Sequence, residues 1–467
     1  MHRPNILIFM PDQMHRETIG PDGSCQTPNF NVLASQGVEF TTAFTATPIC
    51  TPARASMYTG LLPHQHQLLH NSHMIYPKQE NLPEGLCTFA DELGRAGYAT
   101  YHVGKWHVGS SNGPGDHGFK EVESLNVPMT CEDRFVTESV IIPNRCDKKN
   151  VLAAMTSQPR DETQPWRVCQ SAAEFIRHHT RETPDQPFLA FASTDVPHVP
   201  WYTPETYVNR YNAEALEPWP NYGDDLQDKP TSYLKHYNGC DYCRIPGDWP
   251  LAARALTHYY GMITLIDEAF GLILEAIEES GQLENTLIVV TSDHGEFMGR
   301  HGLFGKNEML SDDLIRIPLI ASWPARFRGG CRRDEMVTLC DLYPTLLDAA
   351  GLSGDESRAG RSLLPLFGDQ PAASDWPCDV YLEHHGDLQY NLVRAVRDKR
   401  FKYVYWANDL DELYDLQEDP WEKRNLIFDE RHTARLEALR ARLLELMAGT
   451  DDPFLRGART NLQNSVL

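Results

Sequence analysis

Short, fully apolar runs alternate with longer segments of helical periodicity through most of the chain. Four of these runs predict buried strands: 5–10 (NILIFM), 99–103, 188–193 and 286–291 (TLIVVT). Residues 251–280 carry apolar side chains at helical spacing and end before Gly281, which predicts a helix leading into the last of these strands. The alternation predicts an α/β protein with helices on both faces of one sheet.

The pattern changes near the C-terminus. Three short runs there are of strand type: 380–385, 392–398 and 401–406. Residues 433–447 alternate charge with leucine and predict a helix. We therefore expect a large domain over residues 1–360 and a smaller α+β domain with an antiparallel sheet over residues 361–467. Residues 111–160 and 200–250 have weak periodicity and predict long loops over the sheet.

The composition limits the binding partners and the cellular location that we expect. The chain has 467 residues and a formal net charge of -23, which argues against nucleic acid and anionic membranes as partners. The apolar run 6–10 is too short for a signal peptide core, and no run approaches the roughly 20 apolar residues of a membrane span. Eleven cysteines, an odd number without a disulfide framework, predict a cytoplasmic location.

Polar residues follow the predicted strands. Asp12 and Gln13 lie at the carboxyl end of the first, and Asp293 and His294 at the carboxyl end of the last. In open α/β sheets the ligand crevice lies beyond the carboxyl ends of the strands, so these pairs should converge. Three oxygen donors and one imidazole suit a single divalent cation. Taken singly, each aspartate is more often a helix cap or a turn former.

The stretch CTPARASMYTG (50–60) combines a thiol with the start of a helix. Pro52 suits the first helical position and Thr51 or Cys50 the cap, which points free backbone N–H groups at an anion. Arg54 adds a permanent charge with a geometry that fits tetrahedral oxyanions. A cysteine without this context is more often a small buried core residue.

The pattern Cys-x-Pro-x-Arg followed by Thr59-Gly60 resembles the signature of the type I, formylglycine-dependent sulfatases of the alkaline phosphatase superfamily. Further segments occur in the order of that family: MPDQ, GKWHVG, VPHVP, TSDHGEFMG, GLFGK, GRSLLPLF and ELYDLQEDPWEKRNL. The resemblance covers nearly the whole chain and is close to the arylsulfatase, choline-sulfatase and phosphonate monoester hydrolase group. It implies a large mixed sheet sandwiched by helices, with a smaller C-terminal domain.

The resemblance also implies a metal site, formed by Asp12, Gln13, Cys50, Asp293 and His294. Many sulfatases have Asp-Asp and Asp-Asn at the two strand ends, an all-oxygen site for calcium. Here Gln13 and His294 depart from that pattern, lowering the negative charge and adding a softer donor. Manganese therefore competes with calcium as the expected ion.

By the same resemblance, a formylglycine-generating enzyme oxidises Cys50 to an aldehyde, whose hydrate attacks the sulfur of a sulfate ester. Arg54 and Lys105 hold the substrate. His198 or Lys306 protonates the leaving alcohol, and His107 takes the proton of the second hydroxyl as the aldehyde re-forms and sulfate leaves. A plain serine or cysteine lacks that second hydroxyl and would remain as a sulfated adduct.

Two alternatives stay open. A phosphonate monoester hydrolase or phosphodiesterase of the same superfamily shares Asp-Gln and Asp-His-Gly-Glu but usually lacks the Lys-x-His of GKWH. A non-catalytic anion-binding protein would keep the fold, at the cost of several buried polar groups. The expected substrate is a small anionic sulfate ester, either aryl or small alkyl, and a homo-oligomer would use the C-terminal segment as its contact region.

Several other polar residues match no family position. His15, His64, His66, His70 and His73 are expected to be structural or to lie on the substrate side. Cys240 and Cys243 have a zinc-like spacing, but no second pair completes a tetrahedral site.

Overall fold

The computed structural model describes most of the chain. The described residues are 3–73, 79–125, 127–143, 149–234, 245, 247–306, 309–327, 329–355, 357–368, 370–386 and 391–464. Cys240 and Cys243 lie outside them.

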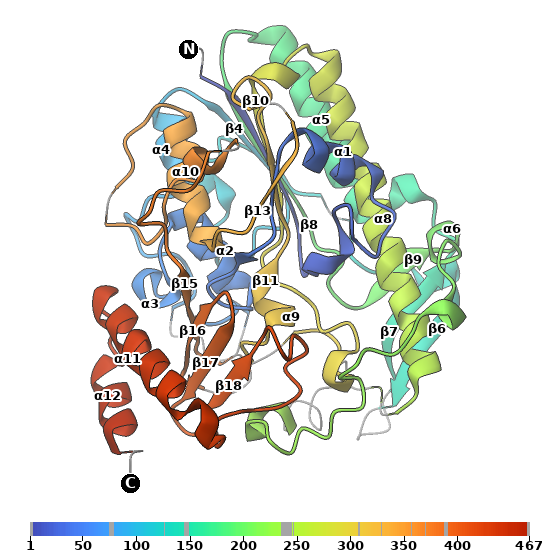
Figure 1. The fold of residues 1–467 in the computed structure, drawn as a ribbon. Coiled ribbons are helices and arrows are strands. Elements are labelled where there is room, and N and C mark those ends of the chain that lie inside the picture. The colour runs from blue at the N-terminus through green and yellow to red at the C-terminus, as the bar shows by residue number, and fades with distance from the viewer. Residues whose placement is uncertain are drawn as a thin grey trace.

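A mixed eight-stranded sheet forms the centre of the molecule (Figure 1). In spatial order its strands are β13 (Cys331–Arg333), β2 (Val38–Phe40), β12 (Leu319–Ser322), β10 (Thr286–Thr291), β1 (Asn5–Pro11), β8 (Phe188–Thr194), β4 (Ala99–Gly104) and β5 (Glu121–Glu123). Strands β10, β1, β8, β4 and β5 run parallel, and β12 pairs antiparallel with β10 and β2. The four strands predicted from apolar runs are all present, and β1 lies between β10 and β8.

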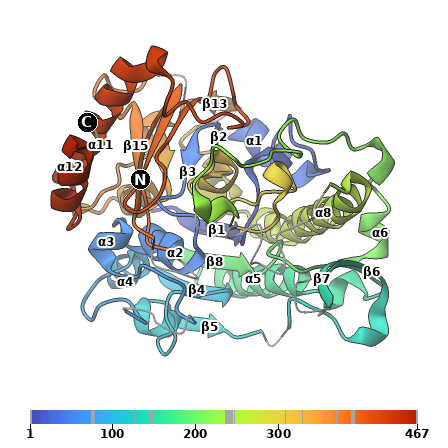
Figure 2. The ribbon, with the colours of Figure 1, turned by 90° about the horizontal axis from the view of Figure 1, so that it is seen from below.

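Helices cover both faces of this sheet, as predicted (Figures 1 and 2). One face carries α1 (Pro28–Gln36), α5 (Gln164–Glu182) and α8 (Trp249–Glu279); the other carries α2 (Cys50–Thr59), α4 (Phe89–Arg95) and α10 (Leu342–Ala349). Successive side chains of β1 enter opposite cores, with Leu7 and Phe9 on the α8 side and Ile6 and Ile8 on the α2 side. A strand buried on both faces is apolar throughout, which is why the sequence predicted it.

The C-terminal part forms an antiparallel sheet, also as predicted. Its strands are β15 (Asp379–His384), β16 (Val393–Asp398), β17 (Phe401–Trp406) and β18 (Glu412–Asp415). Helices α11 (Thr433–Gly449) and α12 (Leu455–Asn464) lie on its outer side (Figure 2). The domain boundary between residues 360 and 361 stays a prediction.

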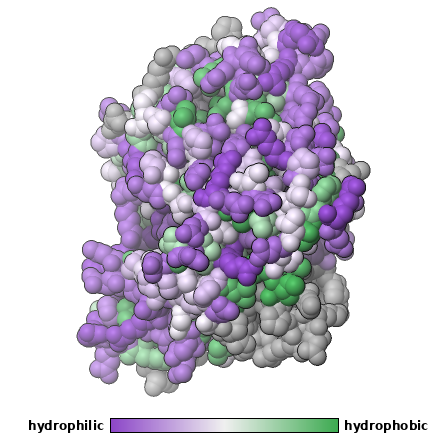
Figure 3. Space-filling view, turned by 90° about the vertical axis from the view of Figure 1, so that its right-hand side faces the viewer, coloured by the Kyte–Doolittle hydropathy of each residue, from purple (hydrophilic) through white to green (hydrophobic). Residues whose placement is uncertain are grey.

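The prediction of long loops was wrong in part. Strands β6 (Val136–Pro143), β7 (Lys149–Thr156) and β9 (Trp201–Pro204) form a small sheet, and α6 (Glu205–Val208) follows β9. Strands β7 and β9 contact α8, which supplies the apolar surface that they cover. The sequence pattern missed them because polar and apolar residues are mixed along β6 and β7, and because β9 is short. The surface on this side of the molecule is mostly hydrophilic (Figure 3).

Smaller elements complete the described part. A three-stranded sheet contains β11 (Arg316–Ile317), β3 (Ala43–Phe44) and β14 (Val337–Thr338), and short helices α3 (Pro63–His66) and α9 (Asp312–Ile315) lie nearby in sequence. Among the described helices, none is both long enough and apolar enough to cross a bilayer. None of the eight described cysteines forms a disulfide within the described part of the chain, and the cytoplasmic location stays a prediction.

Candidate active site

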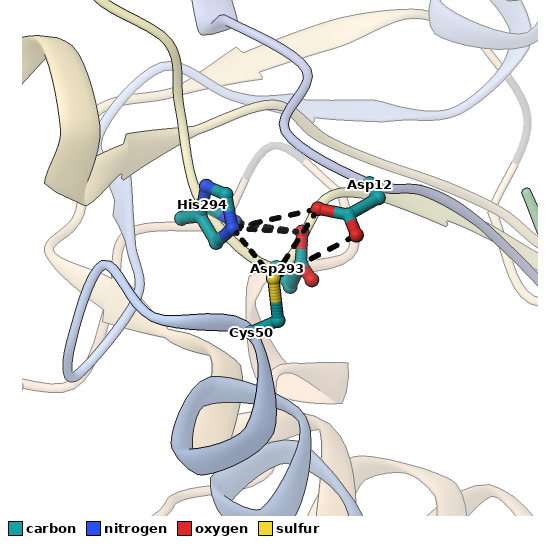
Figure 4. Close-up of side chains that lie close together, drawn as sticks. All are labelled: Asp12, Cys50, Asp293 and His294. Atoms are coloured by element: carbon teal, nitrogen blue, oxygen red, sulfur yellow. Dashed lines mark hydrogen bonds and ion pairs between the residues drawn. The ribbon is translucent and has the colours of Figure 1, made fainter. Parts of the chain in front are cut away.

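The carboxyl ends of the parallel strands bring the predicted residues together. Asp12 and Gln13 follow β1, and Asp293 and His294 follow the adjacent β10. Cys50 lies opposite them in the first turn of α2, with its sulfur directed at Asp12, Asp293 and His294 (Figure 4). All five side chains are almost fully buried.

The start of α2 differs from the prediction. Ile49 is the extended residue before the helix, Cys50 is the first helical residue, and Pro52 is the third. Pro52 costs no hydrogen bond there, because the first four N–H groups of a helix have no intrahelical partner, and the first such bond is Ala53 N to Ile49 O at 2.9 Å. The thiol therefore lies within the first turn rather than at the cap.

Cys50 is surrounded by charged and coordinating groups. Its Sγ lies 3.2 Å from His294 Nε2 and 3.6 Å from Asp12 Oδ1. Lys306 Nζ donates to the sulfur at 2.9 Å, and Lys105 Nζ lies 3.8 Å from it. Burial raises the pKa of the Cys50 thiol to about 11, although Lys306 acts against this rise.

A buried ion pair fixes the position of Arg54. Its Nε donates to Asp293 Oδ2 at 2.8 Å, and its NH1 group donates to Lys105 O and Ser193 Oγ, both at 3.0 Å. Burial alone would raise the pKa of the Asp293 carboxyl, but Arg54 and the other nearby cations hold it well below its usual range. Arg54 NH2 is buried without a hydrogen-bond partner among the described residues, so this N–H group remains for an anionic ligand.

The donor set fits a divalent metal ion. Ligand atoms of Asp12, Cys50, Asp293 and His294 all lie within 4.8 Å of one another, and a single ion can bridge such a cluster. His294 Nδ1 lies 2.9 Å from Gly295 O, which only accepts, so Nδ1 carries the proton and Nε2 presents a lone pair to the cluster. Burial, with Lys306, lowers the pKa of His294 to about 3, which keeps the ring neutral.

Lys105 follows a turn that requires glycine. Gly104 has φ +88°, and a Cβ there would lie 1.9 Å from Ser193 O. The turn lets Lys105 N donate to Ser193 O at 3.0 Å and directs Lys105 Nζ to Asp12. Burial lowers the pKa of Lys105 to about 8.

Replacing Gly104 by alanine is expected to destabilise the protein by about 3 kcal/mol, because it adds a backbone clash to left-handed strain. Gly97→Ala is the matched control: Gly97 has φ +95° but no atom within 4 Å of the place that a Cβ would take, so only the strain of about 1–2 kcal/mol applies. Urea unfolding followed by circular dichroism measures both. Equal losses would contradict the role of the Ser193 contact.

The two remaining predicted histidines lie near these cations. Burial and the charges of Lys306 and Lys105 lower the pKa of His198 well below its usual value, and its Nδ1 lies 2.6 Å from Val199 O. His107 Nε2 lies 3.1 Å from His73 Nδ1, and its Nδ1 is buried without a described partner. Burial, with Lys105, lowers the pKa of His107 to about 2.

The other histidines near the motif have structural contacts. His15 lies 3.6 Å from Asp313, His66 bonds Ser56, and His64 bonds Glu383. His70 Nδ1 lies 2.6 Å from Gly386 O. Apart from His73, therefore, these histidines tie loops and helices together.

Sequence reasoning gave no role to two buried residues of the site. Asn71 Oδ1 accepts from Thr51 N at 3.1 Å in the first turn of α2. The Glu296 carboxylate accepts from Gln13 Nε2, and burial raises its pKa to about 7. The only sequence signal for Glu296 is its place within TSDHGEFMG.

A family model described as Sulfatase matches residues 4–352, and one described as N-sulphoglucosamine sulphohydrolase, C-terminal, matches residues 299–449. The chain is 31% identical to an uncharacterized sulfatase, YidJ, of Escherichia coli K12, over 97% of this chain and 89% of that protein. This chain therefore belongs to the sulfatase family. The sulfatase is also 30% identical to an arylsulfatase of Clostridium perfringens, over 97% of this chain and 96% of that protein.

Among solved structures, the sulfatase is similar to a phosphonate monoester hydrolase of Agrobacterium radiobacter. The TM-score is 0.77 at 25% identity, over 96% of each chain. The family resemblance seen in the motifs is thus confirmed, and the sulfatase is a sulfuric ester hydrolase.

Proposed function

We propose that the sulfatase hydrolyses aryl or small alkyl sulfate monoesters at the cluster around Cys50, after a formylglycine-generating enzyme has oxidised that residue. The observation that carries the proposal is the position of the sulfur, within 4 Å of two lysine ammonium groups and two coordinating side chains. The aldehyde hydrate would supply a nucleophilic oxygen, and a bound Ca²⁺ or Mn²⁺ would supply Lewis-acid polarisation.

Three cations prepare the site for a sulfuryl group. Arg54, Lys105 and Lys306 approach Cys50 and its neighbouring carboxylates from α2, β4 and the turn after Gly305. Their charge is fixed in place by buried contacts before a substrate arrives, which is the condition for strong electrostatic stabilisation of a transition state. The free N–H of Arg54 adds a directed hydrogen-bond donor.

The proton transfers are divided between Lys306 and His107. Lys306 is a donor only, so it suits protonation of the leaving alcohol. The carbonyl contact of His198 Nδ1 and the lowered pKa of the ring leave Nε2 without a proton, so Nε2 can only accept, and Lys306 rather than His198 protonates the leaving alcohol. His107 has a buried Nδ1 without a described partner and is the proton acceptor for the return of the resting state.

The second candidate is hydrolysis of phosphonate monoesters. It is favoured by the similarity to the Agrobacterium radiobacter phosphonate monoester hydrolase. Against it stands the pair Lys105 and His107, since those enzymes usually lack Lys-x-His.

The competing activities are separated by kcat/KM for 4-nitrophenyl sulfate and 4-nitrophenyl phenylphosphonate, measured on one preparation. Both esters are tetrahedral monoanions, but the sulfate presents three non-bridging oxygens to the cations of the site, whereas the phosphonate presents two and carries a second organic group. We therefore expect the sulfate to be preferred by roughly tenfold or more. A preference for the phosphonate would assign the sulfatase to the second activity. Formylglycine content is measured on the same sample by peptide mass spectrometry, so that unmodified protein does not distort the ratio.

A further inference from the structure

Glu296 is a buried carboxylate with three hydrogen-bond donors around it. Its Oε2 accepts from Gln13 Nε2, and its Oε1 accepts from Gly305 N and from Met298 N, the latter at 3.2 Å. The side chain has no exposed surface. None of these donors is a cation, so the Glu296 carboxylate orients its hydrogen-bond donors and does not form an ion pair with them.

The contact with Gln13 decides which end of that amide faces the cluster. In its ionised form the Glu296 carboxylate only accepts, so the Gln13 NH₂ group faces Glu296. On the other side, the donor-only ammonium of Lys306 lies 3.2 Å from Gln13 Oε1. Both neighbours therefore place the amide oxygen, the atom able to bind a metal, on the side of Lys306, whose Nζ also donates to Cys50 Sγ at 2.9 Å.

The backbone of Gln13 is held independently of Glu296. Gln13 N donates to Asp293 Oδ1 at 3.1 Å, and Tyr259 Oη donates to Gln13 O at 2.9 Å. Glu296 therefore controls the orientation of the Gln13 side chain and not the position of the Gln13 backbone. Its second oxygen holds Gly305, the residue before Lys306.

We propose that Glu296 is a positioning residue that presents the Gln13 amide oxygen to the divalent-metal site and holds the turn before Lys306. The proposal rests on the metal site of the proposed function. It assigns Glu296 no contact with substrate or metal; its effect passes through Gln13.

Glu296→Gln tests this role. The amide introduced at position 296 keeps one acceptor oxygen for Gly305 and Met298, but its NH₂ then meets the NH₂ of Gln13, so one amide must turn. We expect the Kd for Mn²⁺, measured on metal-free protein by competition with a chromogenic chelator, to rise about 10–100-fold, as for other lost outer-sphere partners.

The double variant Gln13→Glu/Glu296→Gln exchanges donor and acceptor while keeping the total charge. The amide at position 296 can then donate to the carboxylate at position 13 and still accept from Gly305. We expect Mn²⁺ affinity within about threefold of the parent protein, whereas Gln13→Glu alone, with two carboxylates in contact, binds more weakly through misorientation.

Asp267→Asn is the matched control. Asp267 is a buried carboxylate that accepts from Phe30 N at 2.7 Å and Asn29 N at 3.1 Å, outside the cluster. It should lower stability without changing the Kd for Mn²⁺. A double variant no better than Glu296→Gln, or an unchanged Kd in Glu296→Gln, would overturn the role of Glu296. Failure of the parent protein to bind Mn²⁺ or Ca²⁺ would instead overturn the metal site, and hydrolysis of the sulfate ester is measured separately.

Discussion

Replacing Cys50 by alanine is expected to lower kcat/KM for 4-nitrophenyl sulfate by on the order of 10⁴-fold or more, as for other residues that supply a nucleophile. Alanine cannot be converted to an aldehyde and leaves the surrounding cations without a group to act on. Little stability should be lost, because the thiol contacts the side chains of Asp12, His294, Lys105 and Lys306, and only a small volume is removed. The rate is measured with protein co-expressed with a formylglycine-generating enzyme.

Cys50→Ser sharpens this test. Serine offers one hydroxyl at the same place but lacks the second one needed to expel sulfate. We expect at most a single turnover, with one sulfuryl group retained on the peptide that contains residue 50, detected by mass spectrometry. Cys169→Ala, at a buried thiol of α5 in the hydrophobic core, is the control and should keep full activity. Full-speed turnover by protein that carries only unmodified thiol at Cys50 would refute the formylglycine proposal.

Asp293→Asn is expected to affect both metal binding and stability. The aspartate shares a buried ion pair of 2.8 Å with Arg54. Its loss leaves Arg54 charged, buried and poorly compensated, a situation that costs about 3–5 kcal/mol when one partner of a buried pair is removed. Without this carboxylate, the cluster also loses half of the negative charge supplied by Asp12 and Asp293.

We therefore expect kcat/KM to fall on the order of 10³-fold. Metal content by elemental analysis and the thermal unfolding midpoint, each with and without added Mn²⁺, separate the two effects. Asp267→Asn again serves as the control, since it removes a buried carboxylate far from the cluster in sequence and without contact to it. An Asp293→Asn protein with parent-level metal content and activity would remove this residue from the proposed metal site.

The motif residues could be predicted to meet, but not how they meet. Strand ends at Asp12 and Asp293 followed from two apolar runs, and the rule for parallel strands placed them at one edge of the sheet. Asp12 and Asp293 are neighbours because β1 pairs with β10. The apolar runs predict strands but not the order of those strands in the sheet. The distances between Cys50, Lys306 and His294 depend on that order.

Glu296 illustrates the same limit at the scale of one side chain. Its sequence position says only that it follows a metal-site motif. Its contact with Gln13 joins residues 283 positions apart and depends on a left-handed backbone at Gln13, with φ 65°. Neither feature leaves a pattern in the sequence near either residue.

The sequence by itself determined the class of fold, the strands buried on both faces, the helices that cover them and the family, because hydrophobic periodicity and short motifs are local properties of the chain. The tertiary structure decided the order of the strands, the small sheet of β6, β7 and β9, and the first residue of α2. It also decided which polar atoms face the sulfur of Cys50. These depend on contacts between distant segments, whose free energies are set by packing and charge in three dimensions.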